Sequence, residues 1–116
     1  MATILIAEDE ARIADFIAKG LRKAGYEISI AADGNSALEL SLSGRFDMML
    51  LDIGLPGRDG WSVLRELRAS SQLPVIVVTA FDGPEERHQS IALGANDFVS
   101  KPFKFQNLLN CIRRYL

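Results

Sequence analysis

Side chains that could do chemistry stand within two residues of the ends of four of the apolar runs in this 116-residue chain. Glu8 and Asp9 follow the first run, Asp52 follows the third, Thr79 follows the fourth, and Lys101 follows the fifth. Three carboxylates brought together repel one another, and at least one pKa would rise unless a cation joined them. Oxygen ligands without an imidazole or a thiolate select a hard ion, so we expect Mg²⁺, with Mn²⁺ as the alternative.

Hydrophobic patterning predicts the elements that carry these residues. Five apolar or β-branched runs are expected strands: Thr3–Ala7, Glu27–Ala31, Asp47–Leu51, Pro74–Val78 and Asn96–Val99. Three of them are apolar without alternation, which is typical of strands covered by helices on both faces.

A helical period of 3.6 residues separates the runs. We expect inward-facing stripes at Ile13, Phe16, Ile17, Leu21 and Ala24 before a C-cap at Gly25, at Ala37, Leu38 and Ser41, at Trp61, Leu64 and Leu67, and at Phe105, Leu108, Leu109, Ile112 and Leu116. The fourth helix, from Pro84 to Leu93, has good start signals but few apolar residues, mainly Ile91, Ala92 and Leu93. We therefore expect this helix to shift at low cost.

Five βα units predict an α/β fold of class (βα)₅, with a doubly wound parallel sheet in the flavodoxin-like order 2-1-3-4-5 and one domain over residues 1–116. In such a sheet, ligands bind beyond the carboxyl ends of the strands. Each polar residue alone has a structural explanation: Glu8 and Asp9 could begin a helix, Asp52 could cap a turn, Thr79 suits a strand end, and Lys101 could be solvated. Their joint placement after four strands favours a site.

Composition narrows the class of protein. The net charge of −2 argues against a nucleic-acid or membrane surface, which would need clustered positive charge. No signal peptide and no membrane-length apolar run is apparent. Cys111 is the single cysteine, so no disulfide forms within the chain and a packing role is expected. We expect a cytoplasmic protein.

Four motifs together resemble a known family: Glu8-Asp9, Leu50-Leu51-Asp52-Ile53-Gly54-Leu55-Pro56-Gly57-Arg58-Asp59-Gly60, Val78-Thr79-Ala80 and Phe98-Val99-Ser100-Lys101-Pro102-Phe103. From Thr3 to Leu116 the chain resembles the response-regulator receiver domain of two-component signalling. Within that family, its sequence is most similar to the receivers of winged-helix transcription regulators. The resemblance implies that Asp52 takes a phosphoryl group from a histidine kinase.

The resemblance also implies roles for the residues around Asp52. Asp9 and Asp52 would hold Mg²⁺ directly, with the backbone carbonyl of Gly54, and Glu8 would act through water. Lys101 would neutralise a phosphoryl oxygen, in keeping with a reaction that depends on positioning and charge neutralisation.

The readout implied by the resemblance involves four residues. Thr79 would donate a hydrogen bond to the phosphoryl group, and the Phe98 ring would fill the space that Thr79 vacates. The small Ala80 would leave room, and a cis bond before Pro102 would aim the lysine into the site.

Two other functions compete with a signalling switch. An aspartyl-phosphate phosphatase or phosphotransferase would resemble Asp-x-Asp, but Gly54 stands at the second position. A flavin carrier would need a phosphate-binding loop after the first strand, where Glu8-Asp9-Glu10 would repel the phosphate. Turnover on outside substrates is therefore not expected, beyond the protein's own phosphoryl transfer and slow autodephosphorylation.

The output is open between two possibilities: transcription regulation through an effector domain outside this sequence, or protein–protein interaction by a stand-alone receiver. Related receivers dimerise through the fourth helix, fifth strand and fifth helix, using an arginine that pairs with an aspartate. Asp97 is present, but Cys111 occupies the arginine position, so a homodimer through these elements is possible and the cysteine places it in doubt.

Overall fold

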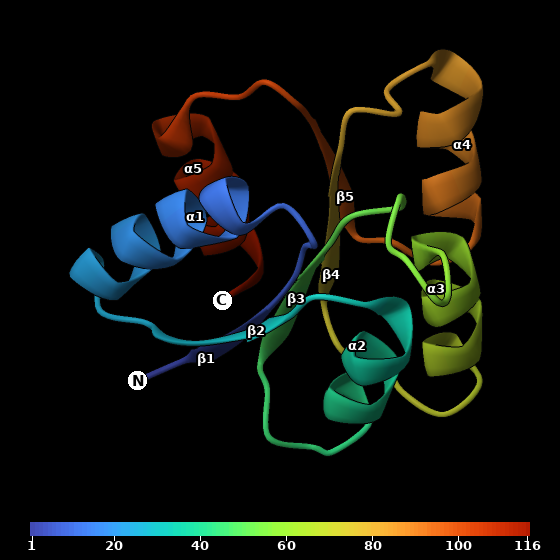
Figure 1. Ribbon diagram of the computed structural model, residues 1–116, viewed down its shortest axis with the longest axis horizontal. Helices are drawn as coiled ribbons and strands as arrows, with labels where there is room; N and C mark the ends of the chain where they lie inside the picture. Colours follow the sequence, from blue (N-terminus) through green and yellow to red (C-terminus); the bar gives the residue numbers. More distant parts are fainter.

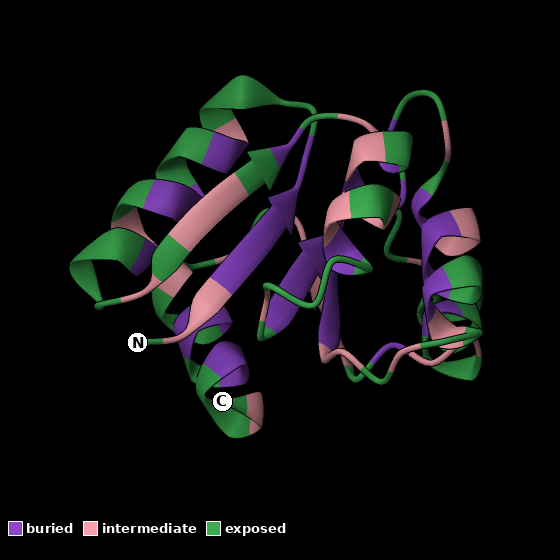
Figure 2. Cartoon of the chain, turned by 90° about the horizontal axis from the view of Figure 1, so that it is seen from below, coloured by how far each residue is buried: buried purple, intermediate pink, exposed green.

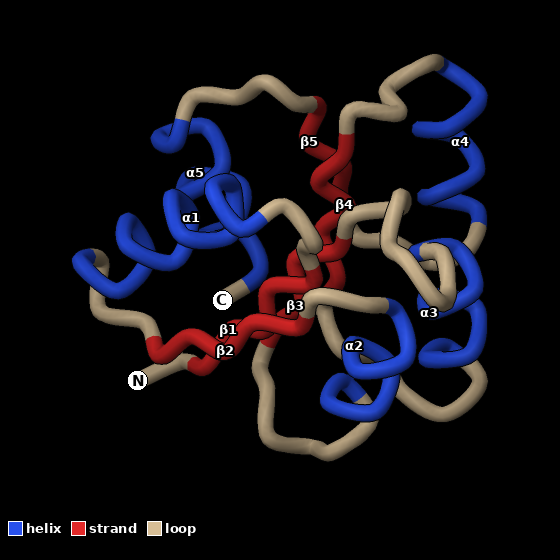
Figure 3. Tube along the Cα trace, viewed as in Figure 1, coloured by secondary structure: helices blue, strands red, loops and turns tan.

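The computed structural model describes residues 1–116, in which strands and helices alternate from the first element to the last (Figure 1). The strands are β1 Thr3–Ala7, β2 Glu27–Ala31, β3 Met48–Leu51, β4 Val75–Thr79 and β5 Asp97–Ser100. The helices are α1 Ala11–Lys23, α2 Gly34–Ser41, α3 Gly60–Arg68, α4 Pro84–Ala92 and α5 Phe105–Tyr115. All strand pairs are parallel, and the order β2-β1-β3-β4-β5 confirms the predicted doubly wound sheet (Figure 3).

Five strand boundaries differ from the prediction by one residue, among them the start of β5, which is Asp97 and not Asn96. β3 begins at Met48; the Asp47 carboxylate accepts a hydrogen bond from the Thr3 N–H at 2.8 Å, and the Asp47 N–H donates to the Thr3 carbonyl at 2.8 Å. β4 begins after Pro74, which has no N–H to donate to a neighbouring strand. Thr79 pairs with Ser100 in the register of β4 and β5, so both strands end one residue later than expected.

Side chains alternate between two cores on the two faces of the sheet. α1 and α5 cover one face and α2, α3 and α4 cover the other, while the central strands between them are buried (Figures 1 and 2). On β1, Ile4 and Ile6 belong to the core under α1 and α5, whereas Leu5 and Ala7 belong to the opposite core. Continuously apolar strands are therefore explained by burial on both faces.

Some predicted inward stripes were wrong at their margins. Phe16 is 54% exposed, since its ring packs at the edge of the core against Phe105, with ring centroids 6.0 Å apart. Ala24 is the exposed C-cap residue of α1, and Gly25 follows it with a φ of 100°, a backbone conformation that favours glycine. Leu116 lies beyond α5 and is 43% exposed.

α4 has the fewest buried residues of the five helices, and the residue that it does bury is not one of those expected. Its one buried residue is Ser90, whereas Ile91 is 48% exposed. The helix begins after Gly83 with Pro84 in its first turn. Because almost no apolar side chain of α4 enters the core, little hydrophobic burial holds it in place. None of the five helices combines the length and the hydropathy that a membrane span needs.

Candidate functional site

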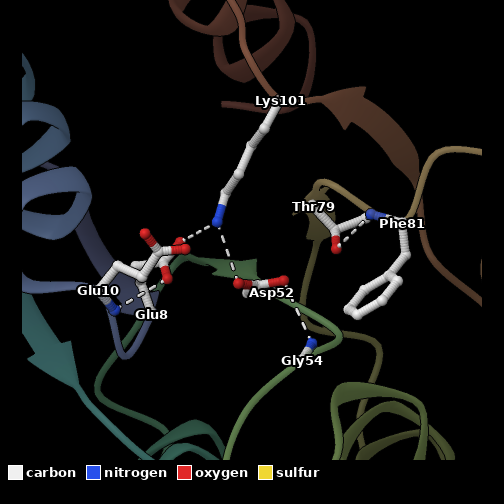
Figure 4. Close-up of polar contacts among 7 residues, drawn as sticks. All are labelled: Glu8, Glu10, Asp52, Gly54, Thr79, Phe81 and Lys101. Carbon is white, nitrogen blue, oxygen red and sulfur yellow. Dashed lines mark hydrogen bonds and ion pairs between the residues drawn. The ribbon is translucent and has the colours of Figure 1, made fainter.

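The carboxyl ends of four strands bring the predicted polar residues to one edge of the sheet (Figure 4). Glu8 follows β1, Asp52 follows β3, Thr79 ends β4, and Lys101 follows β5. The backbone extends the ladder into the site, because the Asp52 N–H donates to the Ala7 carbonyl at 3.0 Å. Glu8 and Asp52 are only 3% and 7% exposed, so two carboxylates lie largely out of water.

The Lys101 ammonium joins these two buried carboxylates. Its Nζ donates to Asp52 Oδ2 at 3.0 Å and to Glu8 Oε1, with the lysine side chain 9% exposed. The peptide bond between Lys101 and Pro102 is cis, as the resemblance implied. A fixed ammonium at this point neutralises negative charge in a place where water can do so only weakly.

Burial and hydrogen bonding shift the pKa values of Glu8 and Lys101. Burial raises the pKa of the Glu8 carboxyl, although hydrogen bonds from Lys101 and from the Glu10 N–H work in the opposite direction. Burial alone would lower the pKa of the Lys101 ammonium, but its hydrogen bonds to Glu8 and Asp52 outweigh that effect and raise it. The carboxylates and the ammonium therefore form one electrostatic unit.

An acidic cluster that could hold a metal ion lies next to the ammonium. One carboxylate oxygen from each of Glu8, Asp9 and Asp52 lies within 4.8 Å of the others, and Asp9 is exposed. Asp52 Oδ1 accepts a hydrogen bond from the Gly54 N–H at 3.2 Å, so the turn after β3 orients this carboxylate. Three carboxylates against one ammonium leave an excess of negative charge, which a divalent cation fits. The Gly54 carbonyl as a further ligand stays a prediction.

The hydroxyl predicted for the site is held by its own loop. Thr79 is fully buried, and its Oγ1 accepts a hydrogen bond from the Phe81 N–H at 3.2 Å (Figure 4). Ala80 beside it is exposed, and the Phe81 ring lies over Gly54. Phe98 is 5% exposed and belongs to the core under α2, α3 and α4.

Two glycines place the loop that carries Asp52, and sequence reasoning assigned neither of them this role. A Cβ on Gly60 would lie 2.4 Å from the Asp52 carbonyl oxygen, and a Cβ on Gly34 would lie 1.8 Å from the Arg58 carbonyl oxygen. The Gly60 N–H donates to the Ile53 carbonyl at 2.8 Å. The available signal was a glycine at the first position of α2 and of α3, but a close backbone approach between distant segments leaves no local pattern.

Comparison with known proteins gives one consistent family. The model of the response regulator receiver domain matches residues 4–113. The transcriptional regulatory protein HprR of Escherichia coli K12 is 42% identical over 113 residues, which are 97% of this chain and 51% of that protein. The chain thus spans about half the length of this curated relative.

Solved structures agree in fold. The receiver domain of the Francisella response regulator 1452 superposes with a TM-score of 0.94 at 30% identity, covering 99% of this chain and 96% of that one. The receiver domain of sensor histidine kinase PA1611 from Pseudomonas aeruginosa, described with a magnesium ion in its active-site cleft, gives 0.90 at 34% identity, covering 98% and 96%. The chain therefore belongs to the response regulator receiver domain family of two-component systems, which is consistent with a phosphorylation-dependent switch.

Proposed function

We propose that Asp52 accepts the phosphoryl group, in a reaction that requires Mg²⁺ and uses a histidine kinase as donor. The observation that carries this proposal is the meeting of Asp52, Lys101 and the acidic pair Glu8 and Asp9 at one sheet edge. Nothing in the folding of a sheet requires three carboxylates and an ammonium at one place, whereas phosphoryl transfer requires charge neutralisation and positioning there.

The residues present fit a magnesium ion. Asp9 and Asp52 would hold it, with Glu8 acting through water, since carboxylate oxygens suit a hard cation that keeps several waters. When bound, the ion would supply charge neutralisation for the phosphoryl oxygens. Mn²⁺ would serve in the same place.

The chain's own residues would act as follows. A carboxylate oxygen of Asp52 attacks phosphorus, the bond from phosphorus to the donor breaks, and an acyl phosphate forms on the side chain. Lys101, which already binds Asp52, would pair with a phosphoryl oxygen. The Thr79 hydroxyl would donate to another phosphoryl oxygen. The buried Phe98 ring would fill the space that Thr79 vacates.

We infer that the chain works as a switch and does not turn over outside substrates. Gly54 occupies the place where an aspartyl-phosphate phosphatase would have its second aspartate. The chemistry would then be limited to the protein's own phosphorylation and slow hydrolysis of the acyl phosphate. Residues 1–116 would form one receiver domain, and a cytoplasmic location stays a prediction.

For the output, we propose transcription regulation through a further domain, with interaction as a stand-alone receiver as the alternative. The relative named as a transcriptional regulatory protein, about twice as long, supports the first. The bonding of Asp97 within the chain argues against a homodimer through α4, β5 and α5: its Oδ2 accepts from Cys111 Sγ and from the Tyr115 hydroxyl, each at 3.2 Å, and pairs with Arg114 Nη1 at 3.4 Å.

Intact mass after incubation with a small phosphodonor tests the central proposal. The wild type should gain one phosphoryl group in Mg²⁺ and none in a chelator, and Asp52→Asn should gain none under either condition. An equal adduct on Asp52→Asn, or no adduct on the wild type, would refute the assignment. Asp59→Asn is a matched control, because Asp59 caps α3 through the Ser62 N–H.

A further inference from the structure

An arginine of α4 lies over the ring of the buried aromatic residue on β5. The Arg87 guanidinium carbon is 4.6 Å from the centroid of the Phe98 ring. Its Nη2 also donates to Ser100 Oγ at 3.4 Å, so two residues of β5 fix where the guanidinium sits. Arg87 itself is exposed, whereas Phe98 is 5% exposed. The guanidinium therefore lies between the ring and solvent.

This contact matters because α4 has almost no apolar anchor. Its one buried residue, Ser90, accepts a hydrogen bond from Trp61 Nε1 at 3.3 Å and donates to the Glu86 carbonyl at 2.8 Å. A serine buries far less apolar area than a leucine in the same place would. The helix is thus attached through polar groups on two sides, by Ser90 to α3 and by Arg87 to β5.

The two side chains suit each other chemically. Phenylalanine has no hydroxyl with which to hold its ring in one position, but the face of its ring attracts a cation. A planar guanidinium can lie against an aromatic face while its N–H groups reach a second acceptor, here Ser100.

We propose that Arg87 is a positioning residue that holds the Phe98 ring in its buried place and ties α4 to β5. α4 begins five residues after Thr79, so a displacement of the loop after β4 reaches the Phe98 ring through Arg87. Arg87 then makes α4 and the Phe98 ring move together.

Amide hydrogen exchange in the full chain tests this role. Arg87→Met keeps the length of the side chain and removes the charge, whereas Arg87→Lys keeps a cation. The methionine variant should raise exchange rates in α4 about two- to fivefold, the size expected for loss of an exposed cation–π contact, and leave α2 unchanged. The lysine variant should restore most of the protection. His88→Met, at the next exposed position, is the matched control and should leave α4 unchanged.

The double variant separates positioning from a general effect on the helix. If Arg87 acts mainly through the ring, Arg87→Met in a Phe98→Leu background should add much less exchange than in the wild type, because only the hydrogen bond to Ser100 is then left to lose. The upfield ring-current shift of the Arg87 δ-protons in the wild type should also vanish in Phe98→Leu. Additive effects of the two substitutions, or equal exchange in the lysine and methionine variants, would overturn the proposal.

Discussion

Replacing Lys101 with methionine tests how the buried charges are balanced. The substitution keeps an unbranched side chain but removes the ammonium that pairs with Glu8 and Asp52. Removing one partner of a buried ion pair typically costs about 3–5 kcal/mol, because an uncompensated charge stays behind. We expect about 2–4 kcal/mol here, since the cluster opens to solvent on the side of the exposed Asp9.

Two conditions should reduce that loss of stability. Mg²⁺ should restore most of it, because a divalent cation can take over the neutralisation of the carboxylates. Acid should also reduce it. The folded-state pKa of Glu8 is raised above its ordinary 4.5, so ionisation of Glu8 destabilises the fold increasingly as pH rises from 4.5 through the folded-state pKa. The penalty in Lys101→Met should therefore be larger at pH 7 than at pH 5.

Urea unfolding of both proteins provides the assay, with a chelator or Mg²⁺ at pH 7 and with the chelator at pH 5. Lys104→Met is the matched control, since Lys104 is exposed and forms no ion pair. A destabilisation that neither Mg²⁺ nor acid reduces would mean that Lys101 contributes through packing and not through charge.

Three further outcomes are expected. Gly60→Ala should cost about 1–3 kcal/mol in urea unfolding, because its Cβ meets the Asp52 backbone. Gly54→Ala, whose Cβ lies 2.9 Å from the exposed Phe81 ring, should cost under about 0.5 kcal/mol, because a surface ring can move aside. Equal losses of stability in the Gly60 and Gly54 variants would contradict this reasoning. Burial raises the pKa of the Cys111 thiol to about 12, so iodoacetamide at pH 8 should label it only after unfolding; rapid native labelling would refute this. Asp97→Asn should lower the melting temperature at pH 7 and much less at pH 2. Burial works to raise the pKa of Asp97, but hydrogen bonds outweigh it and lower the pKa. The ionised carboxylate therefore stabilises the fold above pH 3.8, and this stabilisation is lost as pH falls through the folded-state pKa. An equal loss of melting temperature at both pH values would count against this account.

The sheet and its site edge could be predicted because each depends on local signals. Apolar runs without alternation gave the central strands, and the side chains following them gave the edge. Thr79 shows the limit, since only pairing with Ser100 decides whether it ends β4 or follows it.

Contacts between distant segments could not be predicted. Phe16 has the spacing of a core residue, yet neighbouring rings of α5 and the preceding loop leave it at the edge. Ser90 gave no sign of burial, because only the approach of Trp61 makes a polar residue suitable there. The same holds for Arg87, whose partner ring is supplied by β5.

Reduction of the acyl phosphate tests the central claim most directly. After incubation with a small phosphodonor and Mg²⁺, borohydride converts a phosphorylated aspartate to homoserine, which peptide mass analysis locates. We predict homoserine at position 52 alone, in amounts that fall to background when Mg²⁺ is chelated. Homoserine at Asp9 or another aspartate, or a yield at position 52 that is independent of the metal, would contradict the account.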